Sequence, residues 1–181
     1  KDPPARDMQD TFCIKDRPGF VLRTHTSPVQ IRYMETHSAP LAIIVPGKAF
    51  RNESTDATHE MQFHQLEGLV VGEGITVEQM KGVILNFLKE LFGEGTELRL
   101  RPSFFLFVEP GFEVDARVGD KWLELGGAGM VHPNVFNSVG YDPKKMTGFA
   151  FGFGIDRLTN IKFGIHDLRF AYQGDLRFNQ F

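Results

Sequence analysis

Two side chains of opposite charge stand two residues apart in the first half of the chain. Arg51 and Glu53 belong to the run FRNESTDATHE, residues 50–60. In an extended segment such side chains share a face. The guanidinium is a forked cation for a phosphate, and the carboxylate is an acceptor for an exocyclic amine. The same spacing also suits an ordinary cross-strand ion pair, so the pair alone leaves both interpretations open.

The next predicted strand has an unusual mixture of side chains on one face. Phe63, Gln65, Glu67 and Leu69 alternate along residues 61–71, and a buried glutamate is rare unless it has a partner. One interpretation is that Gln65 and Glu67 bind a ligand ammonium while Phe63 and Leu69 exclude water. The other is the solvated outer face of a hairpin.

A strand that alternates large and small residues lies near the C-terminus, in GFAFGFGIDRL, residues 148–158. Phe149 and Phe151 lie on one side, and Ala150 and Gly152 leave the other nearly bare. A strand face without large side chains can form a flat wall against which an aromatic ring of a ligand packs. Arg157 follows where the pattern turns helical, so its guanidinium is predicted to lie beside that wall, where a phosphate could bind.

Two further pairs could contribute to a binding site. Phe105 and Phe107, in SFFLFVEP, share a face if the segment is extended. They could hold an aromatic ring edge-to-face, although aromatic stripes are also ordinary core. His25 and Ser27 suit hydrogen bonding to a carboxylate, and loop capping by Ser27 is the alternative.

Composition narrows the class of protein. The chain has 181 residues, 41% of them hydrophobic, and a formal net charge of −3, which predicts one domain without the long basic surface of an autonomous nucleic-acid binder. No apolar run approaches a bilayer span and no signal pattern opens the chain, and the lone Cys13 suits a reducing interior. These features predict a cytoplasmic protein without membrane contact. The six histidines lack zinc-site spacing.

Periodicity predicts more strands than crossover helices. Helices are expected at 29–36, 76–91, 132–137 and 155–163, and strands at 41–45, 49–53, 61–71, 97–101, 112–118, 121–126 and 147–152. Thr76 and Gln79 form a capping-box pattern that starts the second helix, and Gly93 ends it. The pattern favours an α+β domain with an antiparallel sheet and helices packed to one side.

Six strings in order resemble one family. They are RTHTSPVQIR, FRNESTDATHE, FHQLEG, RPSFFLFVEP, ELGGAGMVHPNV and GFAFGFGIDRL. Together they resemble the alpha subunit of bacterial phenylalanyl-tRNA synthetases over essentially the whole chain. Two of them look like motifs 2 and 3 of class II synthetases, and the class I signatures HIGH and KMSKS are absent. The resemblance implies a class II synthetase-like antiparallel sheet flanked by helices.

The resemblance also implies roles for individual residues. It assigns ATP binding to Arg51, Glu53, His59 and Arg157, with Arg51 and Arg157 as the catalytic cations. It assigns phenylalanine binding to His25, Ser27, Gln65, Glu67, Phe105, Phe107, Ala150 and Gly152, and a magnesium contact to Glu109. The implied reaction joins L-phenylalanine to ATP as phenylalanyl-adenylate with release of pyrophosphate, before transfer to tRNA(Phe).

The resemblance also implies a partner subunit, and two other hypotheses about the function stand beside it. Residues 1–181 would be the catalytic core with motifs 2 and 3, without the N-terminal coiled coil and motif 1, and the full-length protein would form a heterotetramer with the beta subunit. Asp156 stands where many relatives have glutamate. Two other hypotheses are a class II synthetase for another amino acid, such as phosphoserine or pyrrolysine, and a synthetase-like protein that binds without catalysis.

Overall fold

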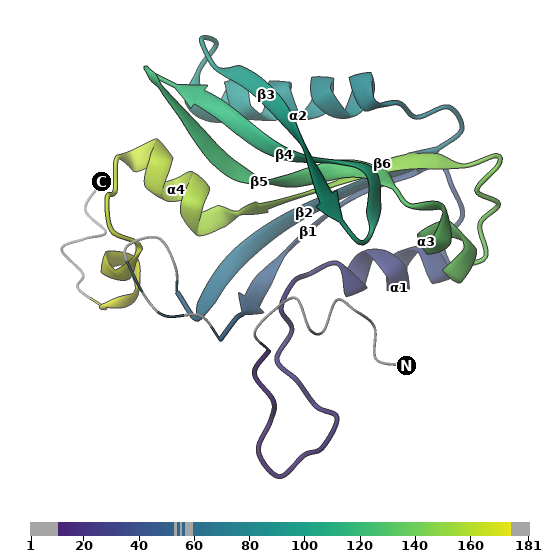
Figure 1. Cartoon of the computed structure of the whole chain (residues 1–181), viewed down its shortest axis with the longest axis horizontal. Coiled ribbons are helices and arrows are strands. Elements are labelled where there is room, and N and C mark those ends of the chain that lie inside the picture. The colour runs from purple at the N-terminus through teal and green to yellow at the C-terminus, as the bar shows by residue number, and fades with distance from the viewer. Residues whose placement is uncertain (1–10, 53, 55, 57–59, 175–181) are drawn as a thin grey trace.

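The described part of the chain is built on a six-stranded antiparallel sheet with helices on both faces (Figure 1). A computed structural model describes residues 11–52, 54, 56 and 60–174. The strands are β1 (Leu41–Phe50), β2 (Gln62–Gly72), β3 (Glu97–Phe105), β4 (Val108–Val118), β5 (Lys121–Val131) and β6 (Thr147–Gly154). The helices are α1 (Pro28–Thr36), α2 (Val77–Phe92), α3 (Pro133–Ser138), α4 (Ile155–Phe163) and the 3₁₀ helix η2 (Leu168–Tyr172). The predicted α+β class is confirmed.

The last strand enters the middle of the sheet. The order is β1-β2-β6-β5-β4-β3, so β6 pairs with β2 on one side and β5 on the other. Strands β2 and β6, which are far apart in the sequence, therefore lie side by side within the sheet. One row across it contains Glu67, Gly152, Gly127 and Glu113, each directly opposite the next.

Two hydrophobic clusters hold the helices against opposite faces of the sheet. The first joins α2 and α4 to one face, and three side chains on a helical stripe of α2, Met80, Ile84 and Leu88, are fully buried in it. The second joins α1 and α3 to the other face through Met34 and Phe136. The sequence predicted helices on one side only, and this expectation is wrong. Figure 1 shows α2 and α1 on opposite sides of the sheet.

Helix α2 begins and ends where its sequence signals predict. The Thr76 side chain accepts a hydrogen bond from the Gln79 N–H, and the Gln79 side chain accepts one from the Thr76 N–H, which completes the capping box. At the other end, the Gly93 N–H donates to the Lys89 carbonyl, with φ at +105°. These bonds satisfy backbone groups that the helix itself leaves unpaired.

Several predicted strand limits are wrong. Residues 41–50 form one strand rather than two, because Pro46 lies on β1, an edge strand of the described sheet, where a missing N–H is tolerated. Strand β1 ends at Phe50, and Arg51 follows the strand instead of lying on it as predicted. Strands β3 and β4 continue to a two-residue turn, and β5 continues to Val131. Bulges near Ser103 and Gly111 obscure the alternation there.

Two further structural facts bear on the sequence-based expectations. None of the helices in the described ranges is long and apolar enough to cross a bilayer. Cys13 has a free, exposed thiol on a short two-stranded arm, which is bridged through Val21 and projects away from the sheet (Figure 1).

Candidate active site

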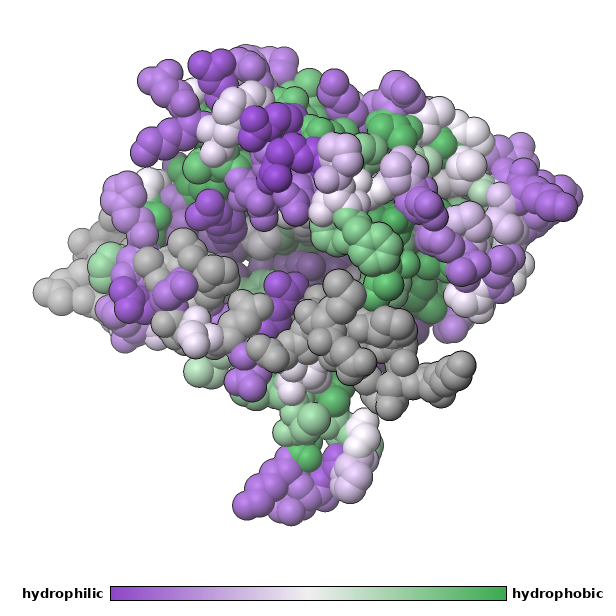
Figure 2. Space-filling view, in the orientation of Figure 1, coloured by the Kyte–Doolittle hydropathy of each residue, from purple (hydrophilic) through white to green (hydrophobic). Residues whose placement is uncertain are grey.

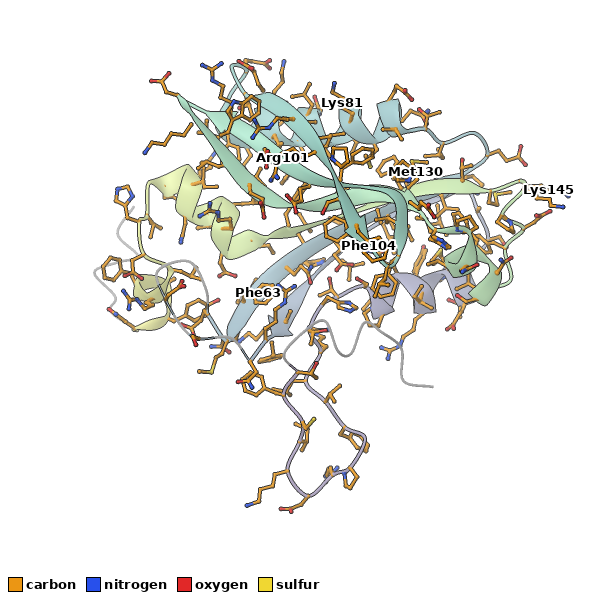
Figure 3. The ribbon with its side chains drawn as sticks, viewed as in Figure 1. Phe63, Lys81, Arg101, Phe104, Met130 and Lys145 are labelled. Carbon is orange, nitrogen blue, oxygen red and sulfur yellow. The ribbon has the colours of Figure 1, made fainter. Side chains whose placement is uncertain are left out.

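A cavity of about 1250 Å³ lies on the face of the sheet that carries α1. Figure 2 shows a hollow at the middle of the molecule with hydrophobic side chains beside it, and Figure 3 places Phe63 on β2 and Phe104 near the end of β3 around it. The lining includes ten residues that the sequence analysis selected: His25, Ser27, Arg51, Gln65, Glu67, Phe105, Phe107, Ala150, Gly152 and Arg157. Two others, Glu53 and His59, lie outside the described residues.

Small residues form the floor of this cavity. Phe149 is buried in the α2 side of β6, and Ala150 and Gly152 line the cavity as predicted, although parts of Phe151 and Phe153 line it too. A Cβ atom on Gly152 would lie 3.3 Å from the Gln65 amide nitrogen and 3.4 Å from Glu67 Cγ. The bare backbone therefore lets a ligand approach the sheet beside these two polar side chains.

Glu67 is a buried carboxylate at the edge of this floor. Its side chain is 5% exposed. The Ser27 hydroxyl donates to Oε1 at 2.8 Å, and the Gln30 amide donates to Oε2 at 2.6 Å. Both donors are neutral, and burial raises the pKa of Glu67 above its ordinary value. A cationic ligand group would relieve this cost. The alternative of a solvated outer hairpin face is therefore wrong.

A short segment before α1 carries His25 and Ser27 across the sheet. Thr26, between them, is 1% exposed. Its N–H donates to the Gln65 amide oxygen at 3.1 Å, and its hydroxyl donates to the Val45 carbonyl at 3.3 Å. These contacts hold the segment against β1 and β2, and they fix the orientation of the Gln65 amide group.

His25 offers an unused hydrogen-bonding atom to the site. Its Nδ1 is buried and has no hydrogen-bond partner among the described residues. Burial, assisted by the positive charge of Arg51, lowers the pKa of His25, so the neutral ring is favoured. The ring centroid lies 5.9 Å from that of Phe107. A buried nitrogen without a partner is the kind of atom that a polar ligand satisfies.

The two predicted clamp phenylalanines reach the cavity by different routes. Phe105 ends β3, and Phe107 lies in the two-residue β3–β4 turn, so the expectation that both share one strand face is wrong. The Phe105 ring lies over Gly127, where an added Cβ would come within 2.9 Å of it. Both rings still line the cavity because the hairpin folds its tip toward the site.

Two guanidinium groups lie along the same cavity. The central carbon of Arg51 sits 4.8 Å from the centroid of the Phe63 ring, and its Nε donates to the Thr24 carbonyl at 3.5 Å. Arg157 lies in the first turn of α4, directly after β6. The forked positive charge of a guanidinium suits an anionic ligand group such as a phosphate.

Sequence reasoning missed several polar residues of the site. Glu113 and Glu124 line the cavity, and each forms an ion pair with Arg101 Nη2, at 2.7 and 3.0 Å. Arg101 also binds Asp115, and this hydrogen bond above all lowers the pKa of the buried carboxyl. Gln30 was missed as well, although its position one helical turn after Ser27 was a usable signal.

Glu109, the predicted magnesium contact, lies apart from this lining. Its carboxylate is exposed and sits 3.2 Å from His132 Nε2. Across the described ranges, no three His, Cys, Asp or Glu side chains are grouped so that they could hold a metal ion.

Comparison with known proteins defines the class. Residues 1–181 match the family model described as tRNA synthetases class II core domain (F), and the chain belongs to this family. A solved structure, the pyrrolysyl-tRNA synthetase from Desulfitobacterium hafniense, superposes with a TM-score of 0.65 at 22% identity, covering 93% of this chain and 58% of the other. At that identity the superposition shows a shared fold.

Curated relatives with higher sequence identity to the chain share one name. The chain is 52% identical over 177 residues to the phenylalanine–tRNA ligase alpha subunit of Synechocystis sp., covering 98% of this chain and 53% of the relative. It is 51% identical over 192 residues to the alpha subunit of the same name from Geobacter sulfurreducens, covering 99% and 56%. The chain therefore spans about half the length of these curated relatives.

Proposed function

We propose that this chain is the catalytic core of a phenylalanine–tRNA ligase alpha subunit, which activates L-phenylalanine with ATP and transfers it to tRNA(Phe). One observation carries the proposal. A single cavity brings together the buried carboxylate of Glu67, the bare wall at Ala150 and Gly152, and the guanidinium groups of Arg51 and Arg157. At about 1250 Å³ it has room for an amino acid and a nucleotide together.

Each part of the amino acid has a complementary part of the cavity. The ammonium pairs with Glu67, which Ser27 and Gln30 orient. The ring lies against Ala150 and Gly152, beside Phe105 and Phe107. This arrangement leaves the substrate carboxylate directed toward His25 and Arg51, where the nucleotide phosphates would meet it.

The proposed chemistry requires positioning and charge neutralisation. The substrate carboxylate oxygen forms a bond to the α-phosphorus of ATP, and the bond to the leaving pyrophosphate breaks. Arg51 and Arg157 stabilise the negative charge that is shared among the phosphate oxygens. No covalent enzyme intermediate is needed, so alignment of the two substrates supplies much of the rate enhancement.

Magnesium is the proposed cofactor of ATP. When bound, the ion would neutralise phosphate charge, and Mg²⁺ typically needs only one or two protein carboxylates besides the phosphates. Glu113 and Glu124 fit this requirement because both line the cavity and meet at Arg101. Glu109 does not line the cavity, and its role stays a prediction. The proposed ATP contacts of Glu53 and His59 likewise stay predictions.

The relatives' name supports the proposed assembly. Because they are called alpha subunits, we propose that the full-length protein pairs with a beta subunit as a heterotetramer in the cytoplasm. Residues 1–181 would supply motifs 2 and 3, and motif 1 and the coiled coil would belong to other parts of the protein.

The direct test is phenylalanine-dependent exchange of pyrophosphate into ATP by the complete complex. Exchange that is strong with phenylalanine and weak with pyrrolysine or phosphoserine supports the proposal. Phosphoserine is disfavoured because the cavity wall around Ala150 includes Leu69 and Val131, which are apolar. A complex that binds phenylalanine without any exchange would instead be a synthetase-like binding protein.

Enlarging the pocket at Ala150 should change the choice of substrate. Ala150→Gly removes a methyl group from the wall against which the ring lies. We expect exchange with para-chlorophenylalanine to rise by roughly tenfold or more, since one methyl-sized space changes discrimination by about 1–3 kcal/mol. Phenylalanine itself should remain a substrate. An unchanged ratio of the two kcat/KM values would show that the ring lies elsewhere.

A further inference from the structure

Asp156 joins three segments at the end of the cavity that holds Arg157. The pairing of β2 with β6 ends at Gln65 and Gly154, where β6 passes into α4. One residue beyond that pair on β2, the His64 N–H donates to Asp156 Oδ2 at 2.5 Å. On the other side, the Tyr172 hydroxyl donates to Asp156 Oδ1 at 2.9 Å.

These bonds fix the first turn of α4. The N-cap residue of the helix, Gly154, provides no side-chain cap, and the Asp156 carboxylate ties the first turn to β2 and to Tyr172. Arg157 is the next residue along the chain. A change in the placement of Asp156 would therefore move the start of the Arg157 side chain as well.

Tyr172 links Asp156 to the segment after α4, which forms part of the cavity wall. After α4, Ile165 and His166 line the cavity beside Arg157, and Leu168 is 5% exposed. Tyr172 ends the 3₁₀ helix that follows. Burial, together with the hydrogen bond to Asp156, raises the pKa of Tyr172, so its hydroxyl remains a donor at neutral pH.

We propose that Tyr172 is a positioning residue for ATP. Through Asp156 it would hold the first turn of α4 and residues 165–172 together, so that Arg157 and this wall face the nucleotide as one surface. The inference rests on the proposed function, because it assigns the nucleotide phosphates to Arg157. It concerns the ATP end of the cavity and leaves the contacts around Glu67 unchanged.

The test is Tyr172→Phe in the complete complex, which removes one hydroxyl and keeps the ring. We expect KM for ATP in pyrophosphate exchange to rise roughly five- to tenfold. This is less than the loss of a whole hydrogen bond to a charged group would give, because Tyr172 acts on ATP only through Asp156. KM for phenylalanine should change by less than about twofold. Tyr141→Phe is the matched control, since its hydroxyl donates to the His37 carbonyl and Tyr141 is absent from the cavity lining.

Two more measurements separate positioning from general stability. In an Asp156→Ala background, Tyr172→Phe should have no further effect on KM for ATP, because the coupling partner is gone. Amide hydrogen exchange at residues 165–172 should be faster in Tyr172→Phe, with β3–β5 unchanged.

The outcomes distinguish this inference from the function on which it rests. A wild-type complex without phenylalanine-dependent exchange would overturn the proposed function and this inference with it. A wild-type complex with normal exchange, but an unchanged KM for ATP in Tyr172→Phe, would overturn the inference alone. An equal rise in both KM values would also overturn it, since that pattern indicates a general structural role.

Discussion

Replacing Arg51 with alanine should reduce phenylalanine-dependent pyrophosphate exchange by roughly 100- to 1000-fold, the loss typical of a group that stabilises transition-state charge. The guanidinium lies between the Phe63 ring and the Thr24 carbonyl and lines the cavity. In the proposed reaction it meets both the substrate carboxylate and the α-phosphate. The loss should therefore appear mainly in kcat, since the interaction strengthens as the new bond forms.

A matched pair of variants makes this result specific. Arg117→Ala removes a guanidinium that pairs with Glu97 on β3, away from the cavity lining, and should leave exchange unchanged. Arg51→Lys should recover only part of the activity, because an ammonium carries the charge without the fork. If Arg51→Ala and Arg117→Ala have similar exchange rates, Arg51 has no role in charge stabilisation.

Glu67→Gln should raise KM for phenylalanine by roughly 100-fold. The change keeps the shape of the side chain and removes the charge that would pair with the substrate ammonium. Losing one partner of a buried charge pair costs about 2–5 kcal/mol, and each 1.4 kcal/mol corresponds to about tenfold in affinity. KM for ATP should change far less, since the proposed function assigns Glu67 to the amino acid and not to the nucleotide.

The same substitution, which should weaken phenylalanine binding, should raise the free energy of unfolding at neutral pH. Burial raises the pKa of Glu67 above its unfolded value. The stabilising contribution of such a group is present below the unfolded pKa and is lost as pH rises through the folded pKa. Without ligand, Glu67→Gln should therefore be more stable than wild type at pH 7, and the difference should shrink as pH falls toward 4.

Urea unfolding at pH 4 to 7 measures this difference, and Glu73→Gln serves as its control. Glu73 is exposed in the turn after β2, so its substitution should alter neither stability nor KM. A Glu67→Gln variant that binds phenylalanine normally would contradict the assignment of the ammonium to this carboxylate. A variant that loses both binding and stability would show that Glu67 is mainly a structural residue.

Local patterns predicted much of the site. The alternation along β2 placed Gln65 and Glu67 on one face, and the alternation of large and small residues along β6 predicted the wall at Ala150 and Gly152. Both patterns were readable because each strand has a buried face and a cavity face, so a period of two persists. The capping box and glycine stop of α2 were equally local signals.

Other features depend on pairings that a single segment does not encode. Gly127 joins the floor because β5 pairs with β6 in a particular register, and Glu113 and Glu124 reach the cavity through the same non-local pairing. The β3–β4 turn at residues 106–107 is Leu-Phe, which lacks the glycine or asparagine typical of tight hairpins. The contact of Asp156 with His64 spans 92 residues.

The central claim is that this cavity binds phenylalanine and the nucleotide as one unit. The most direct measurement is thermal stabilisation of this chain by a non-hydrolysable phenylalanyl-adenylate analogue, with tyrosyl and seryl analogues in parallel. At one hundred times its dissociation constant, a ligand adds about 2.7 kcal/mol to the free energy of unfolding. We predict that the phenylalanyl analogue raises the free energy of unfolding by about that amount and that the other two analogues raise it much less. Equal shifts for all three analogues, or a larger shift for the seryl analogue, would contradict the assignment.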